Sequence, residues 1–363
     1  MYSKAISVLK IFVSHGYEAY IVGGYPRDNL LGKKTLDIDI CTNAKPKDII
    51  EIFDTASISD IKYGYVSIIY KNAKFDVTTF RRDIKYEDNR KPIRVKYIDD
   101  LKKDLLRRDF TINTMCIDCD GNLIDLLGAK KDLDMHIIKM VGNPRYRLKE
   151  DSLRILRAIR FATILDFNID GKTQIYIKKY GYLVKKISPN RKREELDKIL
   201  TCLNKERGRD LLIKFGIDKY LGLKNLDSIV LCNDIIGIWS QLDTDGEYPF
   251  TKMEQDNIKN IRSMLKEGID KYTVYKYGLY ISSVVGSIMG ISYQKINNIY
   301  KKLPIYTRKE INVNGMQVAN MLHREPGNYI ADIINDIEYK IVNSEIENEF
   351  SLLADYIIDK YGE

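Results

Sequence analysis

The sequence predicts an α/β head followed by an all-helical remainder. Short apolar runs and strictly alternating segments, both typical of β-strands, occur in the first 140 residues or so. From about residue 145 onward, apolar residues recur at the spacing of helices instead. With 363 residues, the chain is long enough for about two or three structural units.

The head is expected to contain a small mixed sheet flanked by helices. An apolar run over 17–22 leads into a glycine pair, after which Pro26 can begin a short helix that Gly32 ends. Residues 36–40 (LDIDI) alternate strictly between apolar and acidic, as a half-buried strand does. Further strands are predicted at 66–70, 75–79, 95–97 and 115–118, the last followed by a turn at 120–121.

The remainder is expected to be helical throughout. Its pattern begins with a predicted helix over 150–161, and neither a fixed-period repeat nor a low-complexity tract interrupts it. Residues 215–310 carry weak periodicity and no motif. The sequence therefore predicts helices in this region but no chemistry.

Composition excludes several classes of protein. Apolar residues make up 44% of the chain and charged residues 30%, which is enough for a core and unlike a disordered chain. No apolar run approaches the roughly 18 residues of a membrane span, and the first residues lack the apolar region of a signal peptide. Five cysteines, an odd number, argue against a disulfide framework and favour a reducing cytoplasm. The histidines are too widely separated for a histidine-based metal site: His15, His136 and His323.

Positive charge is concentrated in one fifth of the chain. The net charge is +8, yet residues 141–215 alone carry 19 Lys and Arg against 9 Asp and Glu. The rest of the chain is therefore slightly acidic. A solvated helical face is the commoner reason for any single basic run, but a basic stretch of this size also predicts contact with a polyanion.

The strongest motif combines a glycine pair with two aspartates. Gly23 and Gly24 precede the predicted helix, so backbone N–H groups can approach a phosphate at the positive end of that helix. Asp37 and Asp39 are two apart in the predicted strand and so share a face, where two carboxylates can bind a divalent metal. An isolated D-x-D is usually a solvent-facing pair on an edge strand. The glycine element upstream favours phosphoryl or nucleotidyl transfer instead.

A second motif occupies residues 107–113 (RRDFTIN). Asp109 and Asn113 are four residues apart, which on a helix puts them on one face, where they could bind a ribose hydroxyl and a phosphate together. Arg107 or Arg108 could neutralise a triphosphate. By itself, Arg-Arg-Asp is usually a surface ion pair at a helix start, and such pairs contribute little stability.

A third motif, residues 150–157 (EDSLRILR), begins the predicted helix. Asp151, Arg154 and Arg157 recur every three residues and so share a face, while the apolar residues between them can face the core. On a random helix this pattern is most often an ion pair worth a few tenths of a kcal/mol. A chance coincidence of three motifs in this order and at this spacing is remote.

Together the three motifs resemble those of class II tRNA nucleotidyltransferases, the CCA-adding enzymes, and of their relatives the bacterial poly(A) polymerases. These families belong to the DNA polymerase beta-like nucleotidyltransferase superfamily. The pattern G-G-x-x-R-D…D-x-D is met by residues 23–39, R-R-D-F-T-x-N by 107–113 and E-D-x-x-R by 150–154. The similarity continues in a V-T-T-F-R strand (77–81), an L-R-A-x-R-F segment (156–161) and an S-x-x-R-x-x-x-E-L helix start (188–196).

The resemblance covers residues 20–200 strongly and 311–350 faintly, and it implies four domains. These are a nucleotidyltransferase head (1–140), a helical neck that recognises the nucleotide base (141–205), and a helical body (206–310) and tail (311–363) that bind tRNA. The family prefers Ala or Val followed by Val or Ile where Tyr25 and Pro26 stand. That departure concerns details of the triphosphate pocket rather than the reaction class.

The implied reaction is template-independent addition of C, C and A to the 3′ end of tRNA from CTP and ATP, with release of pyrophosphate. The resemblance implies that Asp37 and Asp39 bind two Mg²⁺ ions and that Asp151 and Arg154 recognise the base. Its remaining assignments are triphosphate binding by Gly23, Gly24, Arg27 and Arg108, ribose and phosphate contacts by Asp109 and Asn113, and support of the base-reading pair by Glu150, Arg157 and Arg160.

Asp151 and Arg154 suit cytosine and adenine by one shared pattern. Each of these bases presents an amino donor beside a ring-nitrogen acceptor, so a carboxylate can accept from the first while a guanidinium donates to the second. Uracil and guanine present the opposite pattern, which leaves both protein groups unpaired. The pair is therefore expected to select C and A without a nucleic-acid template.

Other functions stay open on the sequence alone. The 25 residues between Arg81 and Arg107 are comparable to the loop of full CCA-adding enzymes and argue against a C-only enzyme, but an A-adding enzyme or a poly(A) polymerase of the family fits too. A small-molecule nucleotidyltransferase would not need E-D-x-x-R or the basic segment. The intact Asp37 and Asp39 speak against a non-catalytic RNA-binding protein. Asp76, on the V-T-T-F strand, is either a third acidic group of the site or purely structural.

Overall fold

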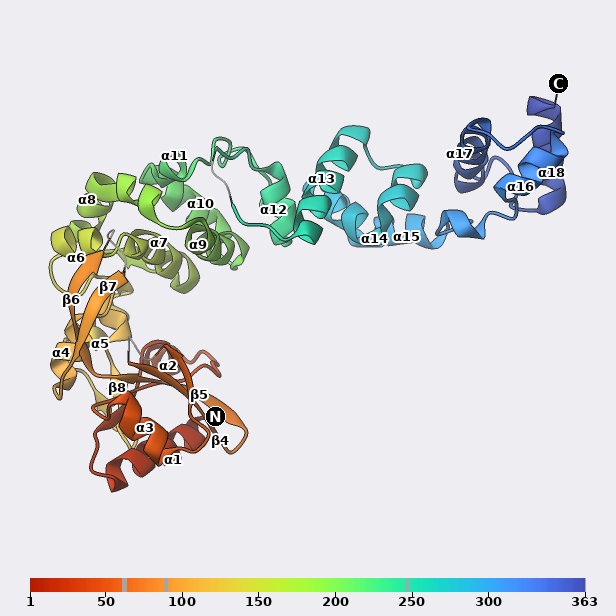
Figure 1. Ribbon diagram of the computed structural model, residues 1–363. Helices are drawn as coiled ribbons and strands as arrows, with labels where there is room; N and C mark the ends of the chain where they lie inside the picture. The colour runs from red at the N-terminus through yellow and green to blue at the C-terminus, as the bar shows by residue number, and fades with distance from the viewer. Residues whose placement is uncertain (61–63, 88–90, 246–247, 363) are drawn as a thin grey trace. The chain divides into compact units, whose positions relative to one another are not determined.

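The computed structural model in Figure 1 describes residues 1–60, 64–87, 91–245 and 248–362. The chain forms two compact units, of which the first comprises Met1–Asp227 with Asp243–Pro249 and the second Ser228–Leu242 with Phe250–Glu363. All strands that the structure describes lie in the first unit. The expected order of an α/β region followed by helices is thereby confirmed, while the finer division into head, neck, body and tail stays a prediction.

A mixed sheet, seven-stranded over the described residues, forms the frame of the α/β region, in the order β3-β4-β5-β2-β1-β8-β9. Strand β2 pairs antiparallel with β1 and parallel with β5, so that Asp39 lies opposite Val22 on one side and Asp76 on the other. This register brings the glycine pair that follows β1 next to the first residue of β2. The strands are β1 (Ala19–Val22), β2 (Asp39–Thr42), β3 (Ser57–Asp60), β4 (Tyr65–Tyr70), β5 (Ala73–Thr79), β8 (Cys116–Ile117) and β9 (Leu123–Ile124).

Apolar side chains cover both faces of this sheet. On one face, α1 (Tyr2–Ser14) and α3 (Pro46–Ile52) enclose a large buried cluster that includes Ile40. On the other face, α4 (Leu101–Leu106) encloses a smaller cluster that includes Cys41, because successive strand residues point to opposite faces. The remaining short elements here are α2 (Gly24–Leu30), η2 (Thr111–Asn113), α5 (Ala129–Asp134) and β10 (Ile137–Ile138), which pairs with β11 (Asn168–Ile169).

A separate two-stranded ribbon extends from this region. It consists of β6 (Arg81–Glu87) and β7 (Lys91–Tyr97), paired antiparallel, with residues 88–90 outside the described part of the chain. The sequence predicted only its last three residues, 95–97, as a strand. Charged residues dominate 81–94, so the apolar alternation by which a half-buried strand is recognised is absent there.

The helices that follow begin with a break that the sequence did not predict. Helix α6 (Pro144–Glu150) ends where the single helix over 150–161 was expected to begin, and α7 (Leu153–Leu165) starts three residues later. Between them Asp151 is extended, with φ of −144°, and its side chain accepts a hydrogen bond from the backbone N–H of Leu153. Aspartate side chains favour such caps over a helix interior, so the prediction of one continuous helix was wrong at its first turn.

The rest of the first unit packs helices around α7. A buried ion pair joins α7 to α9, since Arg160 Nη1 lies 2.9 Å from Glu195 Oε1 and both side chains are nearly inaccessible to solvent. The helices of this part are α8 (Gly171–Tyr180), η3 (Gly181–Lys186), α9 (Pro189–Thr201), α10 (Lys205–Lys214) and α11 (Ile217–Leu221).

The second unit is helical, as expected, with its own apolar core. Helix α14 is interrupted at Gly278, whose φ of +73° falls outside the helical region. In the described ranges, the structure contains no helix of the length and apolarity that crossing a membrane requires. The helices are α12 (Ile235–Gln241), α13 (Lys252–Glu267), α14 (Lys271–Ile288), α15 (Tyr293–Lys301), η4 (Arg308–Glu310), α16 (Gly315–Met321), α17 (Tyr329–Val342) and α18 (Phe350–Tyr361).

We expect Glu195→Gln to destabilise the first unit, because it leaves the buried guanidinium of Arg160 without its counter-charge. Breaking a buried pair from one side costs about 3 kcal/mol or more, which lowers a thermal midpoint by roughly 6 °C or more in a unit of this size. The adjacent Glu194→Gln is the matched control, because the Arg191–Glu194 pair is half exposed and such pairs contribute about 1 kcal/mol at most. Equal shifts of the thermal midpoint in the two variants would contradict this account.

Candidate active site

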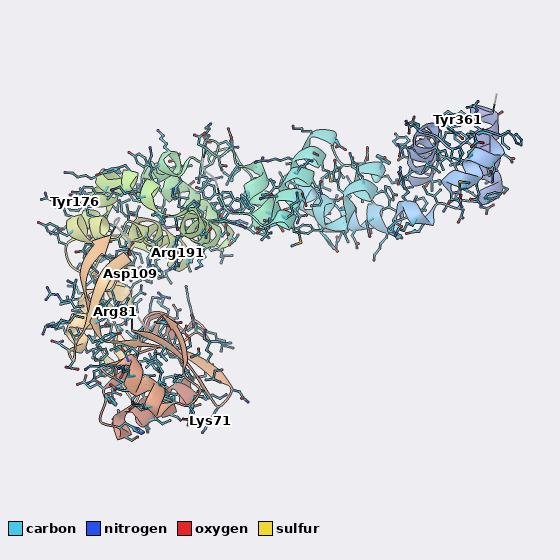
Figure 2. The ribbon with its side chains drawn as sticks, in the orientation of Figure 1. Lys71, Arg81, Asp109, Tyr176, Arg191 and Tyr361 are labelled. Atoms are coloured by element: carbon cyan, nitrogen blue, oxygen red, sulfur yellow. The ribbon has the colours of Figure 1, made fainter. Side chains whose placement is uncertain are left out.

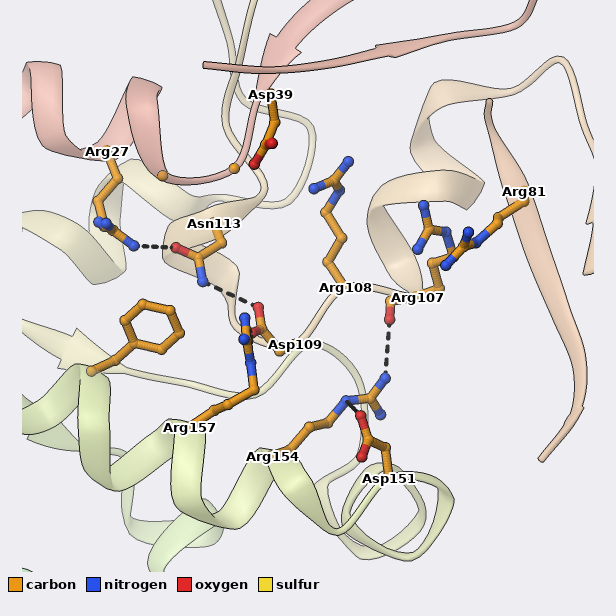
Figure 3. Close-up of a pocket in the computed structure, with 13 residues that line it drawn as sticks. Arg27, Asp39, Arg81, Arg107, Arg108, Asp109, Asn113, Asp151, Arg154 and Arg157 are labelled. Atoms are coloured by element: carbon orange, nitrogen blue, oxygen red, sulfur yellow. Dashed lines mark hydrogen bonds and ion pairs between the residues drawn. The ribbon is translucent and has the colours of Figure 1, made fainter. Parts of the chain in front are cut away.

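A pocket of about 430 Å³ lies between the glycine turn, the first residue of β2 and the start of α7. It gathers residues from all three sequence motifs, which lie between residues 23 and 157 of the chain. Asp39 and Arg108 reach into it from the α/β region, and Arg154 and Arg157 reach into it from α7 (Figure 3). The lining residues are Gly23, Gly24, Arg27, Asp39, Arg81, Arg107, Arg108, Asp109, Asn113, Asp151, Arg154, Arg157 and Phe161.

Ten of the thirteen site residues expected from the sequence line this pocket. The other three, Asp37, Glu150 and Arg160, are not among its lining residues. Sequence reasoning assigned no role to Arg81 and Phe161, and it offered Arg107 only as an alternative to Arg108. The sequence could have indicated these three residues, because each of them lies within one of the segments that resemble the family.

The glycine pair brings backbone close to a carboxylate. Gly23 has φ of +84°, which side-chain-bearing residues rarely adopt, and a Cβ atom there would lie 3.2 Å from Asp39 Oδ2. Gly24 begins α2, and a Cβ atom at Gly24 would lie 3.4 Å from Nη2 of Arg27. The turn therefore leaves open space between the start of α2 and the carboxylate of Asp39.

The two aspartates of the D-x-D motif are placed differently from expectation. Strand β2 begins only at Asp39, because its partner β1 ends opposite that residue, and Asp37 lies in the preceding loop. The expected alternation of exposure nevertheless persists, since Ile38 and Ile40 are buried while Asp37 and Asp39 are exposed. The prediction of a strand over 36–38 was therefore wrong, although both carboxylates lie on the side away from the core.

Acidic neighbours surround Asp39. Partial burial, the charge of Asp37 and the charge of Asp76 together raise the pKa of Asp39 to about 6, against the opposing effect of Arg108. Burial is the largest of these effects, and the neighbouring carboxylates add to it because like charges disfavour ionisation.

Asp76 is anchored within the sheet. Its Oδ1 accepts a hydrogen bond from Ser67 Oγ at 2.7 Å and lies 3.5 Å from the ammonium of Lys74. Burial tends to raise its pKa, but hydrogen bonds from Tyr65 and Ser67 outweigh that effect and lower it. Asp76 thus adds negative charge beside Asp39 while being held by neighbours of its own.

Arginine dominates the opposite side of the pocket. Six of the lining residues are arginines and only three are aspartates, so the lining carries excess positive charge. Two of the arginines share one buried carboxylate, because Asp104 Oδ1 lies 2.7 Å from Arg107 Nη2 and Asp104 Oδ2 lies 3.3 Å from Arg108 Nη2. Clustered guanidinium groups of this kind are suited to phosphate.

Asp109 and Asn113 meet as predicted, but not on a helix. Asp109 precedes the short η2, and Asn113 Nδ2 donates to its Oδ1 at 3.1 Å. On the other side, Asn113 Oδ1 accepts from Arg27 Nη1 at 2.6 Å. A single 3₁₀ turn therefore produces the juxtaposition that we expected of an α-helical face.

Arg157 has a different partner from the expected one. It donates to Asp109 Oδ2 through Nε at 2.8 Å and also through Nη2. Burial alone would raise the pKa of Asp109, but Arg157, Asn113 and the backbone N–H of Phe110 outweigh burial and lower it. Arg157 is thus the counter-ion of Asp109, while its expected support of Asp151 and Arg154 stays a prediction.

Arg154 is held rigidly beside Asp151. Its Nη1 donates to the backbone carbonyl of Arg147 at 3.0 Å, and its Nη2 donates to that of Arg107 at 3.2 Å. Glu150 Oε2 lies 3.6 Å from Nη1, in keeping with the supporting role expected of Glu150. The Nε of Arg154 lies 3.9 Å from Asp151 Oδ2.

The Asp151 carboxylate is itself largely buried. Burial raises its pKa, and the charge of Arg154 opposes this only in part. A carboxylate acceptor and a guanidinium therefore lie side by side at the wall of the pocket.

Arg160 points away from the pocket, toward Glu195, and so does not touch the Asp151–Arg154 pair. Its guanidinium lies 4.6 Å from the ring centroid of Phe161, whose ring also lies near the guanidinium groups of Arg27 and Arg157. Stacking of this kind orients arginines on an aromatic face. Phe161 thereby connects the buried Arg160–Glu195 pair to the pocket wall.

Three family models match successive parts of the chain. The model described as poly A polymerase head domain matches residues 19–139, that of an RNA and SrmB-binding site of polymerase A matches 166–227, and that of tRNA nucleotidyltransferase domain 2 matches 249–357. The first match contains the glycine pair, the aspartates and the R-R-D segment.

Relatives match along the whole length. The chain is 33% identical to the CCA-adding enzyme of Limosilactobacillus reuteri strain DSM 20016 over 98% of this chain and 96% of the relative. It is 29% identical to the CCA-adding enzyme of Bacillus cereus strain G9842 over 98% of both. The crystal structure of the Bacillus stearothermophilus CCA-adding enzyme in complex with CTP superposes with a TM-score of 0.88 at 27% identity, covering 99% of this chain and 97% of that one. With motifs, fold and full-length identity in agreement, this chain belongs to the family of CCA-adding enzymes.

Proposed function

We propose that this chain adds C, C and A in turn to the 3′ end of tRNA, using CTP and ATP and releasing pyrophosphate. The observation that carries the proposal is the pocket in which Asp39, an arginine-rich wall and the Asp151–Arg154 pair meet. It is supported by the full-length similarity to CCA-adding enzymes, one of which binds CTP in its crystal structure.

The arginine-rich wall suits the triphosphate. In this proposal Arg27 and Arg108 bind phosphate oxygens, and Gly23 and Gly24 let the phosphates approach the start of α2. Arg27 and Arg108 line the pocket, and the glycine turn leaves room there because any Cβ atom at Gly23 would crowd Asp39. Charge-assisted hydrogen bonds from guanidinium groups are the strong kind that phosphate recognition uses.

The acidic side suits Mg²⁺. Carboxylates are hard oxygen ligands, and Asp39 lies opposite Asp76 in the sheet and two residues after Asp37, so a divalent cation there would neutralise negative charge. Across the described ranges, no three His, Cys, Asp or Glu side chains form a closed metal cage, and Mg²⁺ is usually held by one or two carboxylates together with substrate phosphates. We therefore assign two Mg²⁺ ions to Asp37 and Asp39, where they would supply Lewis-acid stabilisation of the displacement at phosphorus.

Asp109 and Asn113 are the proposed contacts for ribose and phosphate. In the free protein the Asp109 carboxylate accepts from Phe110, Asn113 and twice from Arg157, which fills its acceptor positions. A ribose 2′-hydroxyl that donates to Asp109 therefore replaces one of these donors. Arg157 keeps the carboxylate ionised and thus able to accept.

Asp151 and Arg154 are the proposed base-reading pair. The two backbone carbonyls that hold Arg154 limit its motion, so its guanidinium is presented in one orientation. Asp151 is fixed by its bond from the Leu153 N–H, which leaves its second oxygen for the amino group of cytosine or adenine. A pair fixed in this way discriminates between bases because a mismatched base leaves both groups unpaired.

We propose that the basic segment 141–215, which includes residues that line the pocket, also contacts tRNA. Lys178, Lys179 and Lys185 are exposed on α8 and η3, and Arg191 on α9 and Tyr176 on α8 belong to the same segment (Figure 2). We assign recognition of the nucleotide base to a neck over 141–205. We assign binding of the tRNA 3′ end and acceptor arm to the basic segment, together with a body over 206–310 and a tail over 311–363. All five cysteines are free, which fits a reducing, cytoplasmic location.

The proposal predicts one pattern of incorporation. We expect tRNA ending at the discriminator base, at C or at CC to be extended with CTP, CTP and ATP respectively in the presence of Mg²⁺, with addition ending after CCA. Each labelled nucleoside triphosphate is supplied singly and the products are resolved by length. Addition of A alone to the CC end, or a long A tail, would instead identify an A-adding enzyme or a poly(A) polymerase.

Asp37→Ala and Asp39→Ala should each abolish transfer of both C and A, because loss of metal binding removes several kcal/mol of transition-state stabilisation, a rate loss of at least about 100-fold. Affinity for tRNA should stay near that of the wild type in a filter-binding measurement. Asp48→Asn is the control, because it removes a carboxylate from α3 of the same α/β region at a position that neither belongs to the D-x-D motif nor lines the pocket. If either alanine variant keeps most of its activity, the metal assignment is wrong.

Asp151→Asn should weaken discrimination against UTP. The amide oxygen can still accept from the Leu153 N–H, while the amide nitrogen presents a donor, which suits O4 of uracil, where the carboxylate presented an acceptor. We expect the C/U and A/U ratios of kcat/KM to fall by roughly one to two decades, since a bidentate base contact is worth about 1–3 kcal/mol of discrimination. Asp151→Ala should lower the same ratios with a larger loss of rate, because it also removes the cap.

The control for this comparison is Asp170→Asn. The side chain of Asp170 accepts from the Thr173 N–H at the start of α8, as that of Asp151 accepts from the Leu153 N–H at the start of α7, but Asp170 does not line the pocket. Its substitution should leave the C/U and A/U ratios unchanged. Unchanged ratios in a folded Asp151→Asn protein would remove the base-reading role, because a merely structural ion pair predicts no change in base preference.

A further inference from the structure

Asp104 on α4 is a charged side chain with no exposure to solvent. It is not a lining residue of the pocket, yet it contacts residues that are. Its Oδ1 accepts from Arg107 Nε at 2.8 Å and its Oδ2 from Arg108 Nη2 at 3.3 Å. Burying a charged carboxylate costs free energy unless hydrogen bonds and opposite charges compensate it. The guanidinium groups of Arg107 and Arg108 supply that compensation here.

The same carboxylate also holds the base of the β6–β7 ribbon. Its Oδ1 accepts from the backbone N–H of Arg81 at 3.1 Å, and Arg81 is the first residue of β6. The side chain of Arg81 lines the pocket as well. Asp104 therefore connects directly to three of the six pocket arginines, two through their guanidinium groups and one through its backbone.

Arginine side chains need such support to recognise phosphate. Each carries about 2 kcal/mol of rotamer entropy, and adjacent guanidinium groups repel one another unless an anion lies between them. Asp104 supplies that anion from behind the pocket wall, so that the arginines can face a ligand without having to be ordered by it. Pre-ordering of this kind increases affinity by lowering the entropic cost of binding.

We propose that Asp104 is a positioning residue that sets Arg107, Arg108 and the backbone of Arg81 for the triphosphate. This inference rests on the proposed function, because it requires the pocket to bind nucleoside triphosphates. It assigns to Asp104 no contact with the substrate. Its effect depends on the phosphates of the ligand, while contacts with ribose and base are left to other residues.

The experiment compares the dissociation constants of CTP and CMP at fixed Mg²⁺ and without tRNA. CTP and CMP have the same base and ribose, so the ratio of their dissociation constants isolates the contribution of the additional phosphates. In Asp104→Asn we expect the preference for CTP over CMP to fall by about tenfold or more, because small misplacements of positioned groups have effects of this order. Affinity for CMP should change much less.

Glu195→Gln is the matched control, because it also removes a buried carboxylate from an arginine in the first unit, and neither Glu195 nor Arg160 lines the pocket. It should lower the thermal midpoint and leave the CTP/CMP ratio unchanged. A folded Asp104→Asn protein with the wild-type ratio overturns the proposal, as does an equal loss of ratio in Glu195→Gln. If the wild type itself binds CTP no better than CMP, the proposed function fails instead.

A second variant covers the case in which Asp104→Asn does not fold. Asp104→Glu keeps the charge and extends the side chain by one methylene group, so it displaces the guanidinium groups without removing their counter-ion. We expect the CTP/CMP ratio to fall in this variant too. An unchanged ratio in folded Asp104→Glu contradicts a role in positioning.

Discussion

Six arginines line one pocket of the first unit, and the electrostatic repulsion among their guanidinium groups must be compensated within the protein. These arginines are held by local counter-charges or carbonyls, among them Asp28 for Arg27, Asp104 for Arg107 and Arg108, Asp109 for Arg157, and two backbone carbonyls for Arg154. These partners lie behind or at the edges of the pocket wall. The repulsion among the arginines is thereby reduced within the protein, and the cavity keeps a positive lining.

Residues 107–109 connect the α/β region to the helices. All three residues line the pocket, while the carbonyls of Arg107 and Arg108 accept from Arg147, and that of Arg107 also from Arg154. Asp109 completes the connection by binding Arg157. One short segment thus orients both the arginines of the pocket wall and the start of α7, so the groups proposed to read the base and to bind phosphate are placed by the same backbone.

The pocket is electrically divided. At one end lies Asp39, whose pKa is raised first by burial and then by the charges of Asp37 and Asp76 nearby. The other end is lined by arginines, which concentrate positive charge. The register of β2 between β1 and β5 produces the acidic end, because it puts Asp39 beside Asp76 and beside the glycine turn. Such a division matches a ligand that combines metal ions with phosphates, and it follows from sheet pairing rather than from any single residue.

Local patterns in the sequence determined the α/β-then-helical order, most strands of the sheet and ten of the thirteen lining residues, because alternation, glycine pairs and short motifs act within a few positions. Tertiary structure alone decided the partners of the charged groups. Arg157 binds Asp109, 48 residues away in the sequence, and Arg160 binds Glu195, 35 residues away. The periodicity of apolar residues cannot predict such contacts. The break at Asp151 also escaped prediction, as did all of the β6–β7 ribbon except 95–97, since a side-chain hydrogen bond and a run of charged residues leave no apolar pattern in the sequence. Packing determines which of several chemically equivalent carboxylates and guanidiniums meet, because only the folded chain brings them within reach.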